Sequence, residues 1–397
     1  MSGARLIRPV ATLLSGVAFA VFACFAALPA ATDGRSRGLV WPAASVSAML
    51  ALEENASRIS RGARATPRFE DPAYAETTRA ILLREPAAFN AMSVRALTLD
   101  KAVVGAGNPD DTARRMSAID AVYRREGLTN LWLIQHRLAE GELAPALDQL
   151  DSMLRTVGEQ RSSVLILLAP VLAAPEAREP LMRILRNRPE WEPNFWYAVT
   201  RNSAATRNGL ILRSALVDPD RARDSDQDAE LIQRGIEQRL FDDAGTLYSS
   251  LTGTQSLSRL RSAQFDAQPR FPPFDWQLVR GQGLNASIDS SRHQLRIYAG
   301  PTGTGTAAKQ VVQLPAGRYS LALRKASHQT DRGDDGVVTR VVCLTGGNRV
   351  LAKASVGPST TFSVPTNCSW QEVTIDIDFA ATAREIVIDA VDLAPSV

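Results

Sequence analysis

The sequence predicts a multidomain chain with α and β parts: an N-terminal transmembrane helix, an α-solenoid of short helical hairpins and a C-terminal, jelly-roll-like β-sandwich. Three observations predict it. Residues 10–31 carry no charge, apolar positions then recur at three and four residues, and beyond a proline-rich stretch they alternate. These are the patterns of spanning helices, amphipathic helices and half-buried strands. The expected parts are an anchor at 1–32, a linker at 33–44, helices at 45–263, a boundary at 264–273 and a sandwich at 274–397.

The anchor is predicted from Val10–Ala31, a stretch of 22 residues without charge. A spanning helix needs about 20 apolar residues to cross the hydrocarbon core. Arg5 and Arg8 precede it, and the positive-inside rule keeps such a terminus in the cytoplasm. We therefore expect a single-pass protein of a bacterial inner membrane, held by residues 10–31, with its body in the periplasm.

Two alternatives use the same stretch. Leu28-Pro29-Ala30 fits a cleaved signal peptide with cleavage near Ala30 or Ala31. Val21-Phe22-Ala23-Cys24 ends in a cysteine, as a lipoprotein signal does, although Phe22 is bulky for one. All three interpretations export residues 33–397.

The net charge and the cysteines further limit the class of partner and the compartment of the protein. The net charge of +3 is small for 397 residues, and no basic tract interleaved with aromatic residues is present, so we expect no nucleic-acid partner. Cys343 and Cys368 both lie in the C-terminal part. An oxidising compartment favours a disulfide between them, and the alternative is two buried thiols on separate strands.

The helical region contains a weak internal repeat. Gly107 and Gly141 lie 34 residues apart, and each precedes an alanine and an apolar helix. A 34-residue helical hairpin is the tetratricopeptide period. The segment Asn130–Val157 resembles one tetratricopeptide unit, with Ala146 and Leu150 at its small and apolar packing positions. Since the other units are degenerate, a general α-solenoid is expected.

Single helices follow from local signals. Asp110 and Asp111 suit the start of a helix over Thr112–Arg125. Glu140-Gly141-Glu142 predicts a turn between helices Leu131–Ala139 and Leu143–Val157. A turn at Phe241–Ala244 is expected to lead into a helix over Gly245–Leu251.

An acidic run, Asp224, Asp226 and Asp228, has the spacing of a calcium loop. Ala229 stands where that loop needs glycine, and Gly235 stands where it needs a bidentate glutamate. The run is therefore expected to cap a helix over Ala229–Arg239.

The pattern changes at Pro269, Pro272 and Pro273. Alternation, β-branched residues and regular glycine or proline turns follow, which indicates a sandwich. The predicted strands are Phe274–Val279, Gln294–Ala299, Lys309–Leu314, Arg318–Leu323, Val337–Leu344, Val350–Ala354, Thr360–Val364, Glu372–Phe379 and Glu385–Val391.

No catalytic constellation is found. His136, His293 and His328 have no cysteine or acidic partner at metal-ligand spacing. Gly303-Thr304-Gly305 lacks the Gly-Lys-Ser/Thr of a phosphate loop and is expected in a hairpin turn, and Asp331–Asp335 in a solvated hairpin tip. The sequence thus predicts a protein that is not an enzyme, with no catalytic, cofactor-binding or metal-binding residues.

Aromatic side chains are candidates for stacking on sugar rings if they are exposed. Core packing is the more general expectation for each, and which of them would face a ligand is unknown from sequence. The candidates are Trp191, Phe195, Trp196 and Tyr197 among the helices, and Trp276, Tyr298, Tyr319 and Trp370 among the strands.

The C-terminal part also carries a resemblance. It is borne by Pro273-Phe274-Asp275-Trp276, Leu314–Tyr319, Cys343, and Phe362-Ser363-Val364-Pro365 with Cys368. In this order they are similar to the C-terminal sandwich of membrane-anchored, tetratricopeptide-like repeat proteins from alphaproteobacterial exopolysaccharide biosynthesis and export loci. The resemblance implies paired cysteines, a supporting role in exopolysaccharide assembly or export, and no catalytic residues.

Three functional hypotheses follow. The first is a non-enzymatic periplasmic scaffold or adaptor that contacts protein partners of an envelope polysaccharide assembly or export system. The second is a carbohydrate-binding envelope protein that holds polysaccharide on its sandwich. The third, with no residues pointing to it, is a polysaccharide hydrolase or lyase.

Overall fold

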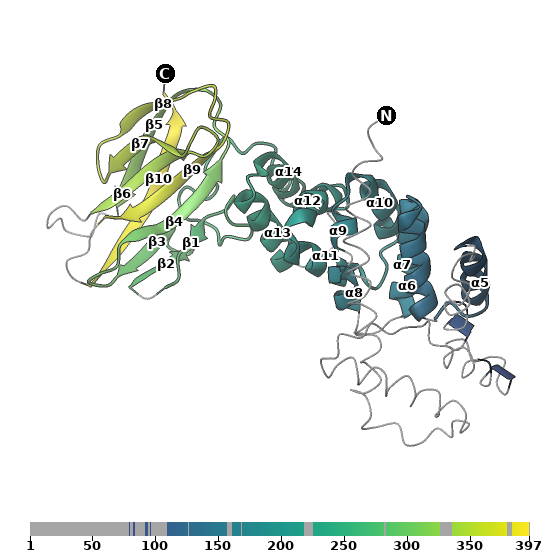
Figure 1. Cartoon of the computed structure of the whole chain (residues 1–397). Coiled ribbons are helices and arrows are strands. Elements are labelled where there is room, and N and C mark those ends of the chain that lie inside the picture. The colour runs from purple at the N-terminus through teal and green to yellow at the C-terminus, as the bar shows by residue number, and fades with distance from the viewer. Residues whose placement is uncertain are drawn as a thin grey trace, which may run out of the picture. The chain divides into compact units, whose positions relative to one another are not determined.

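The computed structural model describes residues 109–125, 127–156, 161–167, 169–217, 225–281, 283–325, 336–378 and 383–396, with six single residues between 79 and 96. The predicted anchor, linker and first helices, His328 and the acidic tip at 331–335 lie outside these ranges. The described chain runs from helices to strands (Figure 1). It divides into two compact units that meet between Asn208 and Gly209, and each is described by itself.

Within the described ranges, none of the helices combines the length and the hydropathy that a membrane span requires. The stretch Val10–Ala31 lies outside the described ranges, so the anchor stays a prediction.

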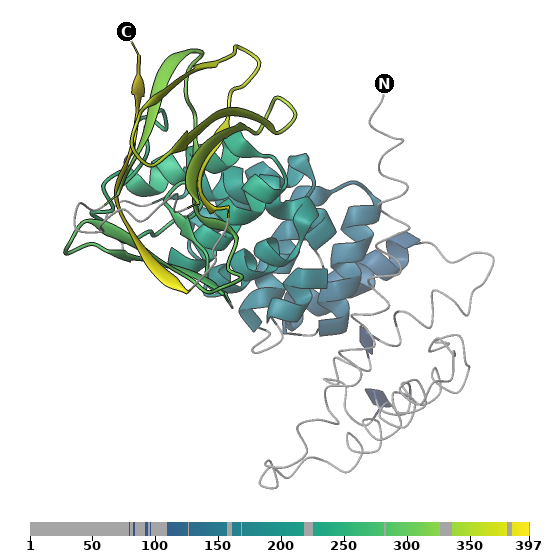
Figure 2. The same cartoon turned by 90° about the vertical axis from the view of Figure 1, so that its left-hand side faces the viewer.

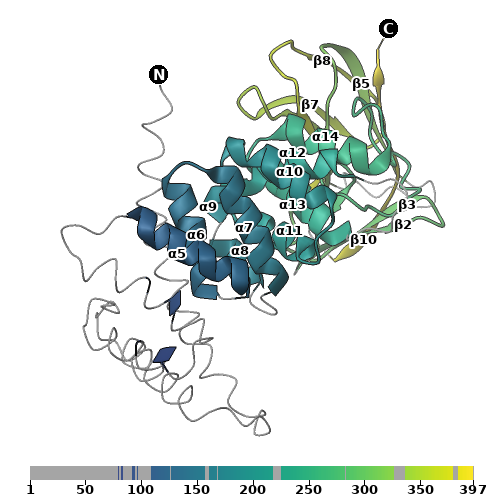
Figure 3. The same cartoon turned by 90° about the vertical axis from the view of Figure 1, so that its right-hand side faces the viewer.

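The first unit consists of short helices. Neighbours in sequence pack together in α5–α6 and α6–α7, while α8 packs on α11 and α7 on α10 (Figure 3). The helices are α5 (Pro109–Val122), α6 (Gly127–Ala139), α7 (Leu143–Thr156), α8 (Arg161–Leu167), α9 (Ala169–Leu172), α10 (Arg178–Arg186), α11 (Glu192–Arg201) and the start of α12 (Thr206–Ala215), with 3-10 turns Pro175–Ala177 and Ser203–Ala205.

The amphipathic period explains how α7 packs. Five of its apolar residues, three and four positions apart, are buried, namely Ala146, Leu147, Leu150, Met153 and Leu154, and Leu143 at its start is half-buried. The predicted turn at Glu140–Glu142 and the helix after it are confirmed. Helical hairpins are therefore present, and the tetratricopeptide-like solenoid remains an interpretation of them.

The second unit begins with the rest of α12 and the helices α13 (Ser225–Glu237) and α14 (Phe241–Thr252), which pack together. The turn predicted at Phe241–Ala244 is wrong, because α14 starts at Phe241. Asp242 and Asp243 lie in its first turn, where the positive end of the helix dipole favours carboxylates.

The acidic run lies at the start of α13, with Asp226 and Asp228 in its first turn. Asp228 is buried and makes a two-pronged ion pair with Arg213, at 2.6 and 3.0 Å. Its role is therefore an ion pair with α12 rather than the cap that the sequence predicts for it.

Among the residues that the structure describes, ten strands form two five-stranded sheets in which neighbouring strands are antiparallel. Figure 2 shows this part of the chain from the side. One sheet has the order β1-β4-β9-β6-β7 and the other β2-β3-β10-β5-β8. The strands are β1 (Gln277–Leu278), β2 (Leu284–Asp289), β3 (Gln294–Ala299), β4 (Gly305–Val312), β5 (Gly317–Lys325), β6 (Val337–Cys343), β7 (Arg349–Ser355), β8 (Thr360–Val364), β9 (Gln371–Ile377) and β10 (Arg384–Pro395). Buried residues of both sheets belong to one apolar core, which makes the pair a sandwich.

Sequence reasoning missed β2. Its residues alternate between buried and exposed, but Gly281 and Gly283 precede it and Asn285 and Asp289 are residue types that strands disfavour, so the sequence there resembles a loop. β2 pairs with β3 as a hairpin.

The hairpin turn predicted at Gly303-Thr304-Gly305 is also wrong. β3 and β4 belong to different sheets, so residues 300–304 cross from one sheet to the other. A Cβ atom on Gly303 would lie 1.9 Å from the Gly283 carbonyl oxygen, and only glycine allows that approach.

The predicted disulfide is present. Cys343 ends β6 and Cys368 lies shortly before β9, and their Sγ atoms are bonded at 2.11 Å. Both residues are buried in the sandwich. The alternative of two separate thiols is therefore not what the structure shows.

Candidate functional site

The site begins with an aromatic cluster that fastens α14 to the sandwich. Trp370, before β9, lies 5.9 Å from Phe241 and 5.7 Å from Phe274 between ring centroids. Tyr248 lies 5.1 Å from Phe274 and 6.3 Å from Phe271. All five side chains are buried.

Gly245 makes this contact possible. It lies on α14 beneath the Trp370 indole, and a Cβ there would come within 2.9 Å of the ring. The helix therefore approaches the sandwich as closely as its backbone permits.

Residues 253–276, between α14 and β1, form a long connection without helix or strand. Its backbone is nevertheless held at several points. The Val311 N–H donates to the Pro273 carbonyl at 2.7 Å, and the Val391 N–H donates to the Ala263 carbonyl at 3.0 Å. The Gln268 side chain donates to the Ile288 carbonyl at 2.7 Å. The connection is thus fastened to β2, to β4 and to β10.

This connection encloses a hollow of about 420 Å³, within the size range of small-molecule sites. Its wall combines the end of α14 with polar and apolar residues of the connection. The lining residues are Leu251, Thr252, Arg261, Ser262, Asp266, Ala267, Gln268, Pro269, Arg270, Phe271, Asp275 and Trp276.

Asp275 holds the hollow to α14. Its carboxylate accepts from the Tyr248 hydroxyl at 2.8 Å and from the N–H groups of Arg270 and Phe271 at 2.9 Å. Burial, and then the Asp275 charge, raises the pKa of Tyr248 well above its ordinary value. The hydroxyl therefore keeps its proton and serves as a donor.

Asp266 is the second carboxylate of the hollow. It accepts from the Ser262 hydroxyl at 2.6 Å, and this hydrogen bond lowers its pKa, with smaller contributions from His293 and Arg261. Asp266 is thus ionised at neutral pH. Carboxylate pairs that cleave glycosides need one member with a raised pKa, so Asp266 suits binding rather than proton donation.

Two arginines complete the hollow. The backbone of Arg261 is held by the Gln310 side chain, through its N–H at 2.9 Å and its carbonyl at 3.2 Å. The Arg270 guanidinium lies 5.2 Å from the centroid of the Phe271 ring. Within the part of the chain that the structure describes, neither guanidinium makes a salt bridge with a carboxylate. The sequence carries no motif for either arginine, because the hollow exists only once the connection folds back on the sandwich.

The candidate aromatics are mostly buried. Trp191, Phe195, Trp196, Trp276, Tyr319 and Trp370 are at most 6% exposed, as core packing predicts. Tyr197 on α11 is 40% exposed and Tyr298 on β3 is 55% exposed. These two rings are available for contacts outside their own unit.

The histidines show no ligand set. His136 stacks on Trp132 at 4.8 Å between ring centroids, and His293 is exposed between β2 and β3. Among the residues described, no group of three or more His, Cys, Asp or Glu side chains could hold a metal ion.

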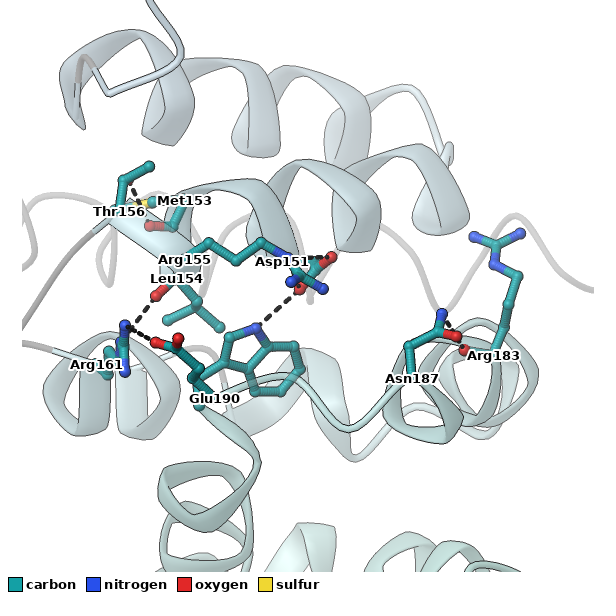
Figure 4. Close-up of polar contacts among 10 residues, drawn as sticks. Asp151, Met153, Leu154, Arg155, Thr156, Arg161, Arg183, Asn187 and Glu190 are labelled. Atoms are coloured by element: carbon teal, nitrogen blue, oxygen red, sulfur yellow. Dashed lines mark hydrogen bonds and ion pairs between the residues drawn. The ribbon is translucent and has the colours of Figure 1, made fainter.

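In the first unit, polar side chains join one helix to the next (Figure 4). Asp151 on α7 accepts from the Trp191 indole N–H at 2.8 Å and from Arg155 at 3.0 Å. Arg161 on α8 donates to the Leu154 carbonyl of α7 at 2.9 Å. These groups are engaged between helices, so their evident role is to hold helix positions.

No family model matches the chain, and no curated protein matches it. A crystal structure of accessory secretory protein 1, 2 and 3 in Streptococcus pneumoniae is 13% identical over 29% of this chain and 87% of that chain, with a TM-score of 0.23. A structure of TmCBM61 in complex with β-1,4-galactotriose is 16% identical over 36% of this chain and 100% of that chain, with a TM-score of 0.24. Likenesses this small carry no argument about this chain.

Proposed function

We propose that the protein is a non-enzymatic scaffold of the bacterial envelope. Residues 10–31 anchor it in the inner membrane, and its periplasmic body supports exopolysaccharide assembly or export through contacts with protein partners. The helical hairpins belong to a tetratricopeptide-like solenoid in this proposal. The Cys343–Cys368 disulfide supports an exported body, since such bonds persist in oxidising compartments.

The observation that carries the proposal is the exposure of one apolar and one aromatic side chain on two neighbouring helices of the first unit. Ile166 on α8 is 42% exposed and Tyr197 on α11 is 40% exposed, and the two helices pack against each other. The Arg201 guanidinium lies 5.1 Å from the centroid of the Tyr197 ring. Tyrosine and arginine are enriched among the residues that dominate binding energy at protein interfaces.

A pull-down of the full-length protein from mild-detergent membranes, followed by mass spectrometry, tests the proposal. We expect polysaccharide polymerase or export components with the wild type and markedly less of them with Ile166→Ala/Tyr197→Ala. Val350→Ala is the matched control, because it removes an exposed apolar side chain from the second unit. Recovery of no such component, or equal recovery with the double variant, would overturn the proposal.

A second candidate function, carbohydrate binding by the sandwich, is favoured by Tyr298. This ring is 55% exposed and lies in direct register with Asn285 of β2 and Glu385 of β10. Arg296, two residues earlier on β3, pairs with Glu385 at 2.7 Å. An exposed ring among planar polar groups suits stacking and hydrogen bonding with a sugar. Unchanged glycan retention by Tyr298→Ala would exclude this face.

A further inference from the structure

We propose that the hollow between α14 and the sandwich binds the carboxylate of an acidic saccharide unit, with Arg261 and Arg270 as the binding residues. This inference rests on the proposed function, because that function brings the protein into contact with an envelope polysaccharide. It adds the chemical class of the ligand and the place where it binds.

The hollow is formed before any ligand arrives. Two hydrogen bonds hold its lining in place. Asp275 accepts one from the Tyr248 hydroxyl, and the Trp276 indole N–H donates the other to the Ser262 carbonyl at 3.0 Å. Gln268 fastens its rim to β2. Long connections without secondary structure are uncommon and are often functional. A ligand that enters a preformed site loses less binding energy to ordering of the protein.

The hollow carries two carboxylates and two guanidiniums, and the guanidiniums are its groups that can bind an anion. The Asp275 carboxylate already accepts three hydrogen bonds, and Asp266 accepts one from Ser262. The Arg261 guanidinium lies within reach of the Tyr248 hydroxyl and close to Asp266. In the described ranges, neither it nor the Arg270 guanidinium forms a salt bridge with a carboxylate. Arginine binds a carboxylate through two parallel hydrogen bonds, and such charge-assisted bonds are the strong ones.

The walls favour an acidic sugar over a neutral one. Trp276 is 1% exposed and Phe271 is 3% exposed, so neither offers its face as a stacking platform. Binding must therefore come from charge and hydrogen bonds. The exposed Asp266 carboxylate is an acceptor for ring hydroxyl groups, which a saccharide carries in addition to its carboxylate.

The backbone disfavours an extended acidic peptide. Such peptides bind largely through main-chain hydrogen bonds. The N–H groups of Ala267, Arg270 and Phe271 already have acceptors inside the loop, and Pro269 has no N–H. A saccharide needs no free main-chain donors, so it suits this wall better.

Titration calorimetry of the full-length protein in mild detergent tests the inference. We expect trigalacturonate to bind and neutral galactotriose to bind at least about tenfold more weakly. The reason is that losing one charge-assisted hydrogen bond lowers the affinity by about tenfold or more. Binding of trigalacturonate is expected to weaken as salt rises, since the hollow is open to solvent. Arg261→Gln/Arg270→Gln is expected to weaken it by about tenfold or more.

Arg259→Gln is the matched control, because Arg259 is an exposed arginine of the same connection outside the lining of the hollow. It should bind trigalacturonate like the wild type. Four results would overturn the inference: no binding, equal binding of the two trisaccharides, no loss in the double variant, or equal loss in the control. Displacement by equimolar inorganic phosphate, or equal affinity for a glutamate oligomer, would also overturn it, in favour of a phosphate or peptide site.

The pull-down separates this inference from the proposed function. If the wild-type protein recovers export components but does not bind trigalacturonate, the hollow is excluded and the scaffold stands. If trigalacturonate binds but no export component is recovered, the site stands and the scaffold is excluded.

Discussion

Two buried tryptophans show how the two units hold their elements together. Trp191 is 1% exposed and Trp370 is 2% exposed, and each donates its indole N–H to an aspartate, Asp151 at 2.8 Å and Asp242 at 2.9 Å. Trp191 meets one other ring nearly edge-on, that of Phe195 at 6.3 Å. The Trp370 ring instead lies among the rings of the aromatic cluster.

The two units also differ, beyond these two tryptophans, in whether polar or aromatic contacts hold their elements together. In the first unit, buried Gln149 donates to Asp120 at 3.0 Å and to Asn130 at 2.6 Å, and accepts from Arg137 at 3.0 Å. It thus ties α7 to α5 and α6. In the second unit, α14 meets the sandwich mainly through buried aromatic area. Polar networks select one arrangement of helices, whereas aromatic burial contributes more free energy.

The largest expected effect is the loss of the aromatic cluster. Trp370→Ala removes the ring that Phe241 and Phe274 contact, and replacing a buried tryptophan by alanine costs about 3–5 kcal/mol. The loss of stability is measured by unfolding the full-length protein in urea, with cleavage of the second unit by a protease as the readout of its unfolding. Tyr298→Ala should change the free energy of unfolding by no more than about 0.5 kcal/mol, as is usual for exposed positions. A loss below about 1 kcal/mol for Trp370→Ala would contradict the importance of the cluster.

The next effect is that of the disulfide, which also stabilises the second unit alone. Cys343→Ser/Cys368→Ser opens a loop with a sequence separation of 25, and such bonds contribute about 2–4 kcal/mol. The same urea experiment should show a lower midpoint for the second unit and an unchanged one for the first. Equal shifts in both units would mean that the units do not unfold separately.

A smaller effect is expected for the polar network of the first unit. Gln149→Leu keeps the volume of the side chain but leaves Asp120, Asn130 and Arg137 without their shared partner. Leaving such groups unsatisfied costs about 1–3 kcal/mol. Hydrogen exchange should speed up in α6 and α7, with the second unit unaffected. A variant as stable as the wild type would show that the network serves specificity alone.

The smallest effect concerns pH. Asp378 receives hydrogen bonds from Lys353 and Arg340, and the first of these contributes most to lowering its pKa below 3.8. The stabilising contribution is therefore complete above the ordinary pKa and is lost as the pH falls through the lower folded value. Asp378→Asn should be slightly less stable than the wild type at pH 7, and the difference should shrink as the pH falls below 3.8. Denaturation midpoints across this range measure the effect, and Lys353→Met should reproduce most of it.

Particular elements show what could be predicted from sequence. β3 and β8 have the predicted bounds, because strict alternation between turn residues leaves one way to bury the apolar face. β2 was missed because glycines precede it and because Asn285 and Asp289 are residue types that strands disfavour. The Phe241 start of α14 was missed because its acidic first turn resembles a loop when the packing of Phe241 on Trp370 is not known.

The candidate site was harder to predict from the sequence than the fold. The predicted burial of most aromatics is confirmed, yet which rings stay exposed depends on neighbouring elements. Arg261 and Arg270 are ordinary loop arginines in the sequence. Their shared hollow arises from hydrogen bonds to Gln310, Tyr248 and Ile288, which lie on other elements.

By itself, the sequence predicted that helices precede strands, and it favoured a disulfide between Cys343 and Cys368, which the structure then showed. Periodicity is a local property, and only two cysteines are available in the C-terminal part, so neither requires knowledge of distant contacts. Tertiary structure alone decided that β3 and β4 lie in different sheets, that α14 joins the sandwich through Trp370, and that residues 253–276 enclose a hollow. Each of these depends on contacts between segments far apart in the chain, and hydrophobic burial selects such contacts only for the molecule as a whole.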